Sequence, residues 1–171
     1  MRCAKYTLQL GIRDVLKYER LDKFLTKLRK VAQHLRSPHT DGILKRRDQK
    51  RVLIDMPTRW GITLLMLQRL ADLKSFIQDL GSQESYLSES EWAEINMMIE
   101  VLQIPHAATL YFQKQDLTAG ECLLCWREVM FKLEKLDNNL AAGLVAALQL
   151  RQEFLLRNDA FLAAVWVSNI C

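Results

Sequence analysis

Proline and glycine are scarce in this sequence, with 3 and 6 residues among 171. Both residue types end helices and mark turns, so their scarcity argues against many short strands joined by tight turns. Long apolar stretches are also lacking. No run approaches the roughly 18 residues of a membrane-spanning helix, and the N-terminal MRCAKYTLQL has no apolar signal-peptide region. The sequence therefore predicts an intracellular protein, nuclear or cytoplasmic, with no membrane partner.

Residues that could hold a metal or perform catalysis are few and scattered. Cys122 and Cys125 have the spacing of half a zinc site, but a structural site needs four ligands and no second pair of Cys or His is evident. On a helix these thiols would lie on roughly one face and pack as small hydrophobic groups. Nucleotide-binding glycine loops, Gly-x-Ser-x-Gly and His-Glu-x-x-His are absent. We therefore expect no cofactor, no metal, no small-molecule substrate and no independent active site.

The chain does contain repeated apolar spacing of the helical kind. Stripes with periods of three and four residues occupy several stretches, namely 8–16, 21–35, 58–80, 92–102, 122–136 and 140–155. With one short helix in the irregular stretch 39–57, they predict an all-α, mainly helical fold of six to eight helices. The apolar run Phe161–Val167 is compatible with one short strand or with a helix end, and periodicity does not decide between them.

Several helix boundaries can be read from local signals. Ser88-x-x-Glu91 and Thr118-x-x-Glu121 have the pattern of capping boxes, and Asn138 or Asn139 is suited to begin a helix. Pro38 is expected to end the helix before it, and the apolar stripe 92–102 is expected to end before Pro105. Pro57 fits the first turn of the helix 58–80, with Asp55 as its cap.

Charge is divided unequally along the chain. Residues 1–80 contain 18 Lys and Arg against 8 Asp and Glu, whereas residues 81–171 contain 6 against 12. We therefore describe residues 1–171 as a single helical segment with a basic half, 1–80, and an acidic half, 81–171. Such asymmetry indicates a nucleic acid or another anionic partner. Solvated helix faces are the alternative explanation for most of these charges.

Two blocks of the basic half resemble motifs of a known family. Residues 2–10, RCAKYTLQL, are similar to the R-C-x-x-H-T-L-Q-L motif of hAT-superfamily transposases and their BED-finger relatives. Thr58-Arg59-Trp60, followed by Thr63 and by residues 66–70, resembles their T-R-W-N-S-T-x-x-M-L-E-R-L. Weaker matches follow in the family's order at Glu91-Trp92, Ala108-Thr109 and Leu162–Val165. Tyr6 replaces the motif histidine, and Gly61-Ile62 replaces Asn-Ser, as in a decayed or domesticated copy.

The resemblance implies a position within a larger catalytic protein. In the family, a helical insertion interrupts an RNase-H-like catalytic domain. Two catalytic carboxylates precede the cysteine motif and the third follows the insertion. The resemblance therefore implies that this chain is a truncated copy of the insertion. It would lack the positions of all three carboxylates and would not be an enzyme.

The resemblance also implies DNA contacts. The Trp that follows Arg in the family stacks on a displaced DNA base, so Trp60 would stack and Arg59 would contact a phosphate or stack as well. From the residues alone, a Trp at the start of an apolar helix is more often part of the core. Phosphate-contact candidates are the cations of KRRDQKR, namely Lys45, Arg46, Arg47, Lys50 and Arg51. This stretch also resembles a nuclear-import cluster.

The function predicted from the sequence is that of a transposase-derived, catalytically inactive fragment with residual, salt-dependent DNA binding. Three alternatives stay open. They are a helical protein-interaction module with no DNA role, a relic of a transposable element with no selected function, and a working transposase, which would need three carboxylates on an RNase-H-like sheet.

Overall fold

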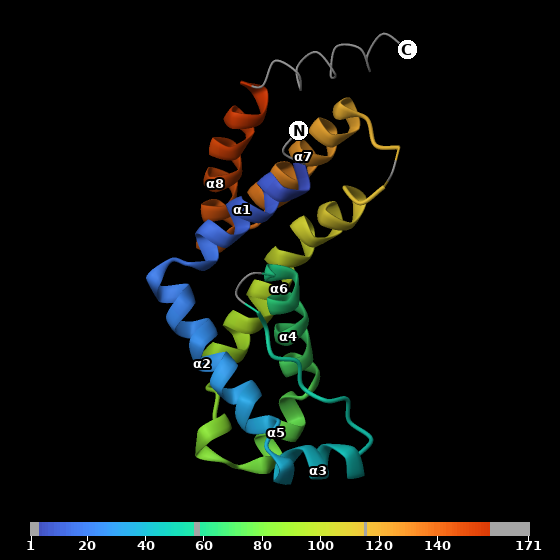
Figure 1. Ribbon diagram of the computed structural model, residues 1–171. Helices are drawn as coiled ribbons and strands as arrows, with labels where there is room; N and C mark the ends of the chain where they lie inside the picture. Colours follow the sequence, from blue (N-terminus) through green and yellow to red (C-terminus); the bar gives the residue numbers. More distant parts are fainter. Residues whose placement is uncertain (1–3, 57–58, 115, 158–171) are drawn as a thin grey trace. The chain divides into compact units, whose positions relative to one another are not determined.

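The computed structural model describes residues 4–56, 59–114 and 116–157. The regular secondary structure in this part of the chain consists of helices alone (Figure 1). Within it are eight α-helices, one short 3-10 helix and no strand, which confirms the predicted all-α fold. The run Phe161–Val167 lies outside the described residues. No helix in the described part is both long and apolar enough to cross a membrane.

The described helices are distributed over two compact units. They are α1 (Ala4–Leu16), α2 (Glu19–Leu35), α3 (Pro38–Arg46), α4 (Trp60–Asp72), α5 (Lys74–Leu80), η1 (Gln83–Ser85), α6 (Glu89–Tyr111), α7 (Ala119–Glu134) and α8 (Asn139–Leu156). Unit 1 comprises the described residues of 1–17 and 101–171, and unit 2 comprises those of 18–100. Helix α6 contributes residues to both units.

In unit 1, α8 packs against both α1 and α7. Gly11 of α1 makes the approach of α8 possible, because a Cβ at this position would lie 3.0 Å from Leu148 Cδ2. An ion pair between Asp14 and Arg151 joins the same two helices. The apolar core includes Leu8, Ile12, Val15, Trp126, Val129, Leu133, Leu140, Leu144 and Leu148.

In unit 2, α2 has the amphipathic character expected from its sequence. Its apolar stripe is buried, whereas Lys23, Lys27 and Lys30 are exposed on the other side. The core of this unit includes Leu25, Leu28, Val31, Leu35, Leu64, Leu67, Leu70, Phe76, Trp92 and Ile95. Most of the stabilisation of both units thus comes from helix faces that are removed from water.

The predicted helix starts are confirmed by their hydrogen bonds. The Thr118 hydroxyl accepts from the backbone N–H of Glu121, whose carboxylate accepts from the Thr118 N–H in return. Ser88 and Glu91 make the same reciprocal pair at the start of α6. Asn138 Oδ1 accepts from the N–H of Ala141 at 2.8 Å.

The prediction that the helix ends before Pro105 was wrong, because α6 continues through this residue to Tyr111. A proline inside a helix removes one hydrogen bond and costs about 3 kcal/mol. Here Pro105 is itself buried, and Leu102, Ala108 and Phe112 continue the buried face around it. Burial of this face outweighs the local cost.

The stretch predicted as one helix, 58–80, is divided into α4 and α5 at Leu73. The Leu73 N–H donates to the carbonyls of both Arg69 and Leu70, which tightens the last turn of α4 before α5 begins. Leu73 is buried. No glycine or proline stands at this point, so tertiary packing of Leu73 accounts for a break that no local signal announces.

The predicted role of Asp55 as a helix cap was also wrong. The N-cap residue of α4 is Arg59, which makes no side-chain capping bond. Asp55 instead has a side chain with 0% exposure that accepts from Arg29 Nε at 2.7 Å, Arg29 Nη2 at 3.0 Å and Thr63 Oγ1 at 2.8 Å. Its hydrogen bond to Arg29 raises the pKa of that guanidinium despite partial burial. The carboxylate therefore joins α2, the segment before α4, and α4 itself.

Replacing Asp55 by Ala is expected to lower the free energy of unfolding by about 3 kcal/mol, because the buried side of Arg29 loses its counter-charge. Asp79→Ala, which removes an exposed partner of Arg47, is the matched control and should cost about 1 kcal/mol or less. Urea titration followed by far-UV circular dichroism measures both. Equal losses for the two variants would contradict the structural role assigned to Asp55.

Candidate nucleic-acid interface

The five phosphate-contact candidates lie together at the end of α3 and in the residues that follow it. We call Lys45, Arg46, Arg47, Lys50 and Arg51 the basic cluster, and all five are exposed. Ser37 begins α3 by accepting from the N–H of Thr40, with Pro38 in the first turn. After α3 ends, Asp48 turns the chain with a φ of 52°, an unusual value for a residue other than glycine.

Three members of the basic cluster have carboxylate partners. Lys45 and Arg51 lie 3.1 and 3.0 Å from the two oxygens of Asp41. The hydrogen bond from Lys45, together with the charge of Arg51, lowers the pKa of Asp41 against the effect of its burial. Arg47 pairs with Asp79 at 3.1 Å and lies over the ring of Phe76, 5.4 Å from its centre. The two contacts of Arg47 hold the cluster near α5.

Arg46 and Lys50 are exposed and have no carboxylate partner among the described residues. Both side chains are therefore open to solvent. A cation that gives up only water on binding a phosphate loses no ion pair in the protein. These two side chains are thus the most accessible anion-binding groups of the cluster.

Arg59 and Trp60 are not brought together with the basic cluster. The segment before α4 runs antiparallel to that helix, because Asp55 accepts from Thr63 in its first turns and the Arg51 carbonyl accepts from Arg69 near its end. From Trp60 to Arg69 the helix rises about 13 Å at 1.5 Å per residue. The cluster therefore lies near one end of α4, and the Arg-Trp pair is at the other (Figure 1).

Trp60 is the first residue of α4 and is 3% exposed, whereas Arg59 beside it is exposed. A ring this deeply buried cannot offer a face to a base without leaving the core. Its burial favours the core interpretation that the residues alone suggested. The base-stacking role rests on the resemblance and stays a prediction.

Folding redistributes the charge that is so unequal along the sequence. Arg20 pairs with Glu94 at 3.1 Å and Lys27 with Glu91 at 2.5 Å, so the start of the acidic half lies against basic α2. Burial alone would raise the pKa of Glu91, but Lys27 and Ser88 lower it. By sequence, residues 18–100 hold 14 Lys and Arg against 12 Asp and Glu, and the remainder 10 against 8. Each unit therefore carries a net charge of +2.

Cys122 and Cys125 form no disulfide with each other and are half-buried on α7, and burial raises the pKa of Cys125. A raised pKa keeps that thiol protonated at neutral pH. Groups of three or more His, Cys, Asp or Glu side chains placed to hold a metal do not occur among residues 4–56, 59–114 and 116–157.

Comparison of the chain with protein-family models, with curated proteins and with solved structures finds no match. The resemblance to transposases therefore rests on the motif residues alone.

Sequence analysis did not find two features of unit 2. The contacts of Asp55 with Arg29 and Thr63 span up to 26 residues of sequence, and spacing carries no signal for them. The pairing of α2 with α6 spans more than 60 residues. Complementary charge on α2 and on the start of α6 was the available signal for the second feature.

Trp60→Ala is expected to lower the free energy of unfolding by about 3–5 kcal/mol, as for other large core side chains. Trp60→Leu keeps an apolar side chain but removes the aromatic face, and we expect it to bind duplex and hairpin DNA as the wild type does. Fluorescence anisotropy with labelled DNA measures affinity, and circular dichroism checks folding. A loss of about 1–3 kcal/mol on the hairpin alone would show instead that the ring stacks on a base.

Proposed function

We propose that this chain is a non-catalytic helical module of transposase ancestry that binds DNA through backbone phosphates. The observation that supports it best is the basic cluster, which presents five exposed cations within seven residues. Phosphate contacts of this kind position a protein on DNA without reading its sequence. The proposed binding is therefore weak, salt-dependent and indifferent to base sequence.

The ion pair of Arg47 does not oppose this function. The exposed Arg47–Asp79 pair contributes about 0–1 kcal/mol. A phosphate that replaces the carboxylate partner also releases a condensed counterion from the DNA, which favours binding at low salt. Arg47 can therefore exchange its carboxylate partner for a DNA phosphate. Arg59, at the other end of α4, would contribute a separate phosphate contact.

Arg46 and Lys50 provide the sharpest test, because neutralising them leaves no carboxylate unpaired. Arg46→Gln/Lys50→Gln is expected to reduce the slope of log affinity against log salt by roughly 1.8, since each lost phosphate contact on duplex DNA removes about 0.9. The measurement is fluorescence anisotropy with labelled duplex across a salt series.

The matched control is Lys30→Gln/Arg127→Gln, which removes the same charge from two other exposed cations without a carboxylate partner in the described structure. We expect its slope to stay that of the wild type. If both double variants weaken binding equally, net charge rather than the cluster determines affinity. Absence of binding at low salt would contradict the proposal altogether.

The proposed lack of catalysis rests on the resemblance and has its own test. Purified protein incubated with labelled duplex and Mg²⁺ or Mn²⁺ is expected to leave both strands intact on a denaturing gel. Metal-dependent strand cleavage that persists through a second purification step would overturn this part of the proposal.

A protein-interaction module is the second candidate function, and exposed apolar side chains on unit 1 favour it. Leu124 and Phe131 are seven residues apart on α7 and thus on one face, and Leu150 and Phe154 are four apart on α8. Exposed apolar patches on a small protein commonly mark contacts with partners. This candidate would be preferred if the salt series shows no DNA binding.

A further inference from the structure

Helix α8 is apolar on two opposite sides. Its inner side, which includes the buried Leu144 and Leu148, belongs to the core of unit 1, where α8 packs against α1 and α7 (Figure 1). From Leu140 to Leu148 the helix has no polar side chain. Further along, Leu150 and Phe154 are 62% and 66% exposed. A helix that is apolar all round is normally buried on more than one side, so its exposed side is suited to a partner.

The exposed residues of α8 form one continuous row. Its members are three or four positions apart, so they follow one another along a single side of the helix. Helical geometry extends to the last of them, because the Arg157 N–H donates to the Glu153 carbonyl at 3.0 Å. We call this row the outer face of α8, and it consists of Asn139, Ala142, Ala146, Leu150, Phe154 and Arg157.

The outer face is symmetric about Leu148, near the middle of the helix. Its six members stand in pairs that are two, six and nine positions to either side of this residue. A two-fold axis at Leu148 that relates two antiparallel helices places each member opposite a member from the other half of the face. The outer face can therefore form an isologous contact, in which the same residues of both copies meet.

The two halves of the outer face complement each other in size. Its apolar residues before Leu148, Ala142 and Ala146, are small, whereas Leu150 and Phe154 after it are large. In an antiparallel pair, Phe154 of one copy meets Ala142 of the other, and Leu150 meets Ala146. Small residues allow helix axes to approach to about 8–10 Å, and the large side chains then fill the space beside them. A parallel pair would instead set large residues against large ones.

The charges at the two ends of the helix also complement each other. In the same antiparallel pair, Arg157 of one copy faces Asn139 of the other, two positions from the exposed Asp137. Within one copy, Arg157 has only an exposed contact with Glu153 at 3.8 Å. Glu153 in turn faces the uncharged Gly143. No like charges meet, and the two-fold axis creates the contact between Arg157 and Asp137 twice.

We propose that the outer face of α8 binds the outer face of a second copy of this chain in an antiparallel, two-fold symmetric pair. A contact made by one helix of each copy is small beside the roughly 1,200–2,000 Å² of a stable interface, so the association is weak and reversible. Each dimer carries two basic clusters, which increases the avidity of the proposed DNA binding. Self-association itself does not depend on DNA and is tested without it.

Leu150→Gln/Phe154→Gln removes the large apolar side chains of the outer face. Both side chains are exposed, so the fold should be retained, which circular dichroism checks. Sedimentation equilibrium of the full chain at micromolar to millimolar concentrations is expected to show a reversible monomer–dimer equilibrium for the wild type. The double variant should weaken it about tenfold or more, because its apolar contacts are lost. A wild type that stays monomeric at millimolar concentration would overturn the proposal.

The matched control makes the same two substitutions on α7. Leu124 and Phe131 are 68% and 57% exposed, close to the values of Leu150 and Phe154. Leu124→Gln/Phe131→Gln is expected to leave the monomer–dimer equilibrium unchanged. Equal weakening by both double variants would show that exposed apolar side chains associate without a defined surface, and the outer face would then have no special role.

The antiparallel register is tested by reversing charges. Arg157→Asp and Asp137→Arg are each expected to weaken the dimer about two- to tenfold, because each places like charges together at both ends of the pair. Mixing the two single variants should restore the affinity, since opposite charges then meet at both ends of the mixed dimer. Neither chain changes on mixing, so recovery cannot come from within one copy. A mixture that associates no better than the separate variants would overturn the proposed pairing.

Discussion

The buried carboxylate of Asp55 is the interaction on which the arrangement of unit 2 depends. It accepts two hydrogen bonds from Arg29 on α2 and one from Thr63 on α4, so a segment without regular secondary structure is fixed between two helices. A buried carboxylate is costly unless it is paired and hydrogen-bonded, and here one side chain receives three donors. Because the segment is held antiparallel to α4, the basic cluster and the Arg59–Trp60 pair are kept at opposite ends of that helix. This attachment thus helps to set the separation between the two groups of proposed anion contacts.

Charge patterning along the sequence gives an incomplete account of charge in the folded protein. The sequence suggests a basic half and an acidic half, yet α2 meets the first turns of α6 through Arg20–Glu94 and Lys27–Glu91. Much of the positive charge thus has a structural partner, and the two units carry equal net charge. The anionic partner indicated by the asymmetry is therefore supported at one place only, where five cations gather within seven residues and two of them have no carboxylate partner among the described residues.

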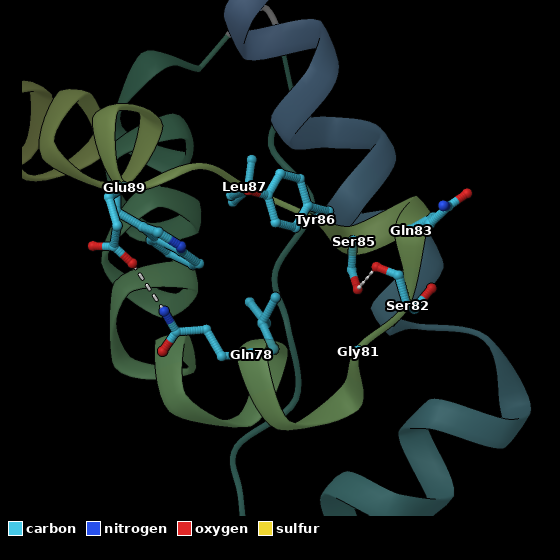
Figure 2. A pocket seen from close by; sticks show the side chains of 10 residues that line it. Gln78, Gly81, Ser82, Gln83, Ser85, Tyr86, Leu87 and Glu89 are labelled. Carbon is cyan, nitrogen blue, oxygen red and sulfur yellow. Dashed lines mark hydrogen bonds between the residues drawn. The ribbon is translucent and has the colours of Figure 1, made fainter.

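The parts of the fold that could be predicted from sequence are those that local chemistry determines. Thr118–Glu121, Ser88–Glu91 and Asn138 start their helices as expected, because a cap involves residues only three apart. The errors at Pro105, Leu73 and Asp55 share one cause. In each case a buried side chain, or a buried ion pair formed with a residue distant in sequence, outweighed a local preference. A pocket lined by residues of the stretch 77–92 (Figure 2) was equally inaccessible to pattern analysis, because its walls come from a helix end, a turn, a 3-10 helix and a helix start that present no periodic signal.

The separation of Trp60 from the basic cluster has a consequence for the ancestry suggested by the motifs. A base platform and a phosphate-binding surface contribute differently to DNA recognition: stacking needs an exposed ring, whereas phosphate contacts need only accessible cations. In this chain the ring is buried and the cations are exposed. The proposed function therefore consists of non-specific attraction to DNA without a means of holding a displaced base. The departures Tyr6 and Gly61-Ile62 occur in the two motifs that carry the resemblance, residues 2–10 and the block that begins at Thr58. On the proposed ancestry, loss of base handling with retention of phosphate binding is the outcome expected for a transposase segment that persists without selection for transposition.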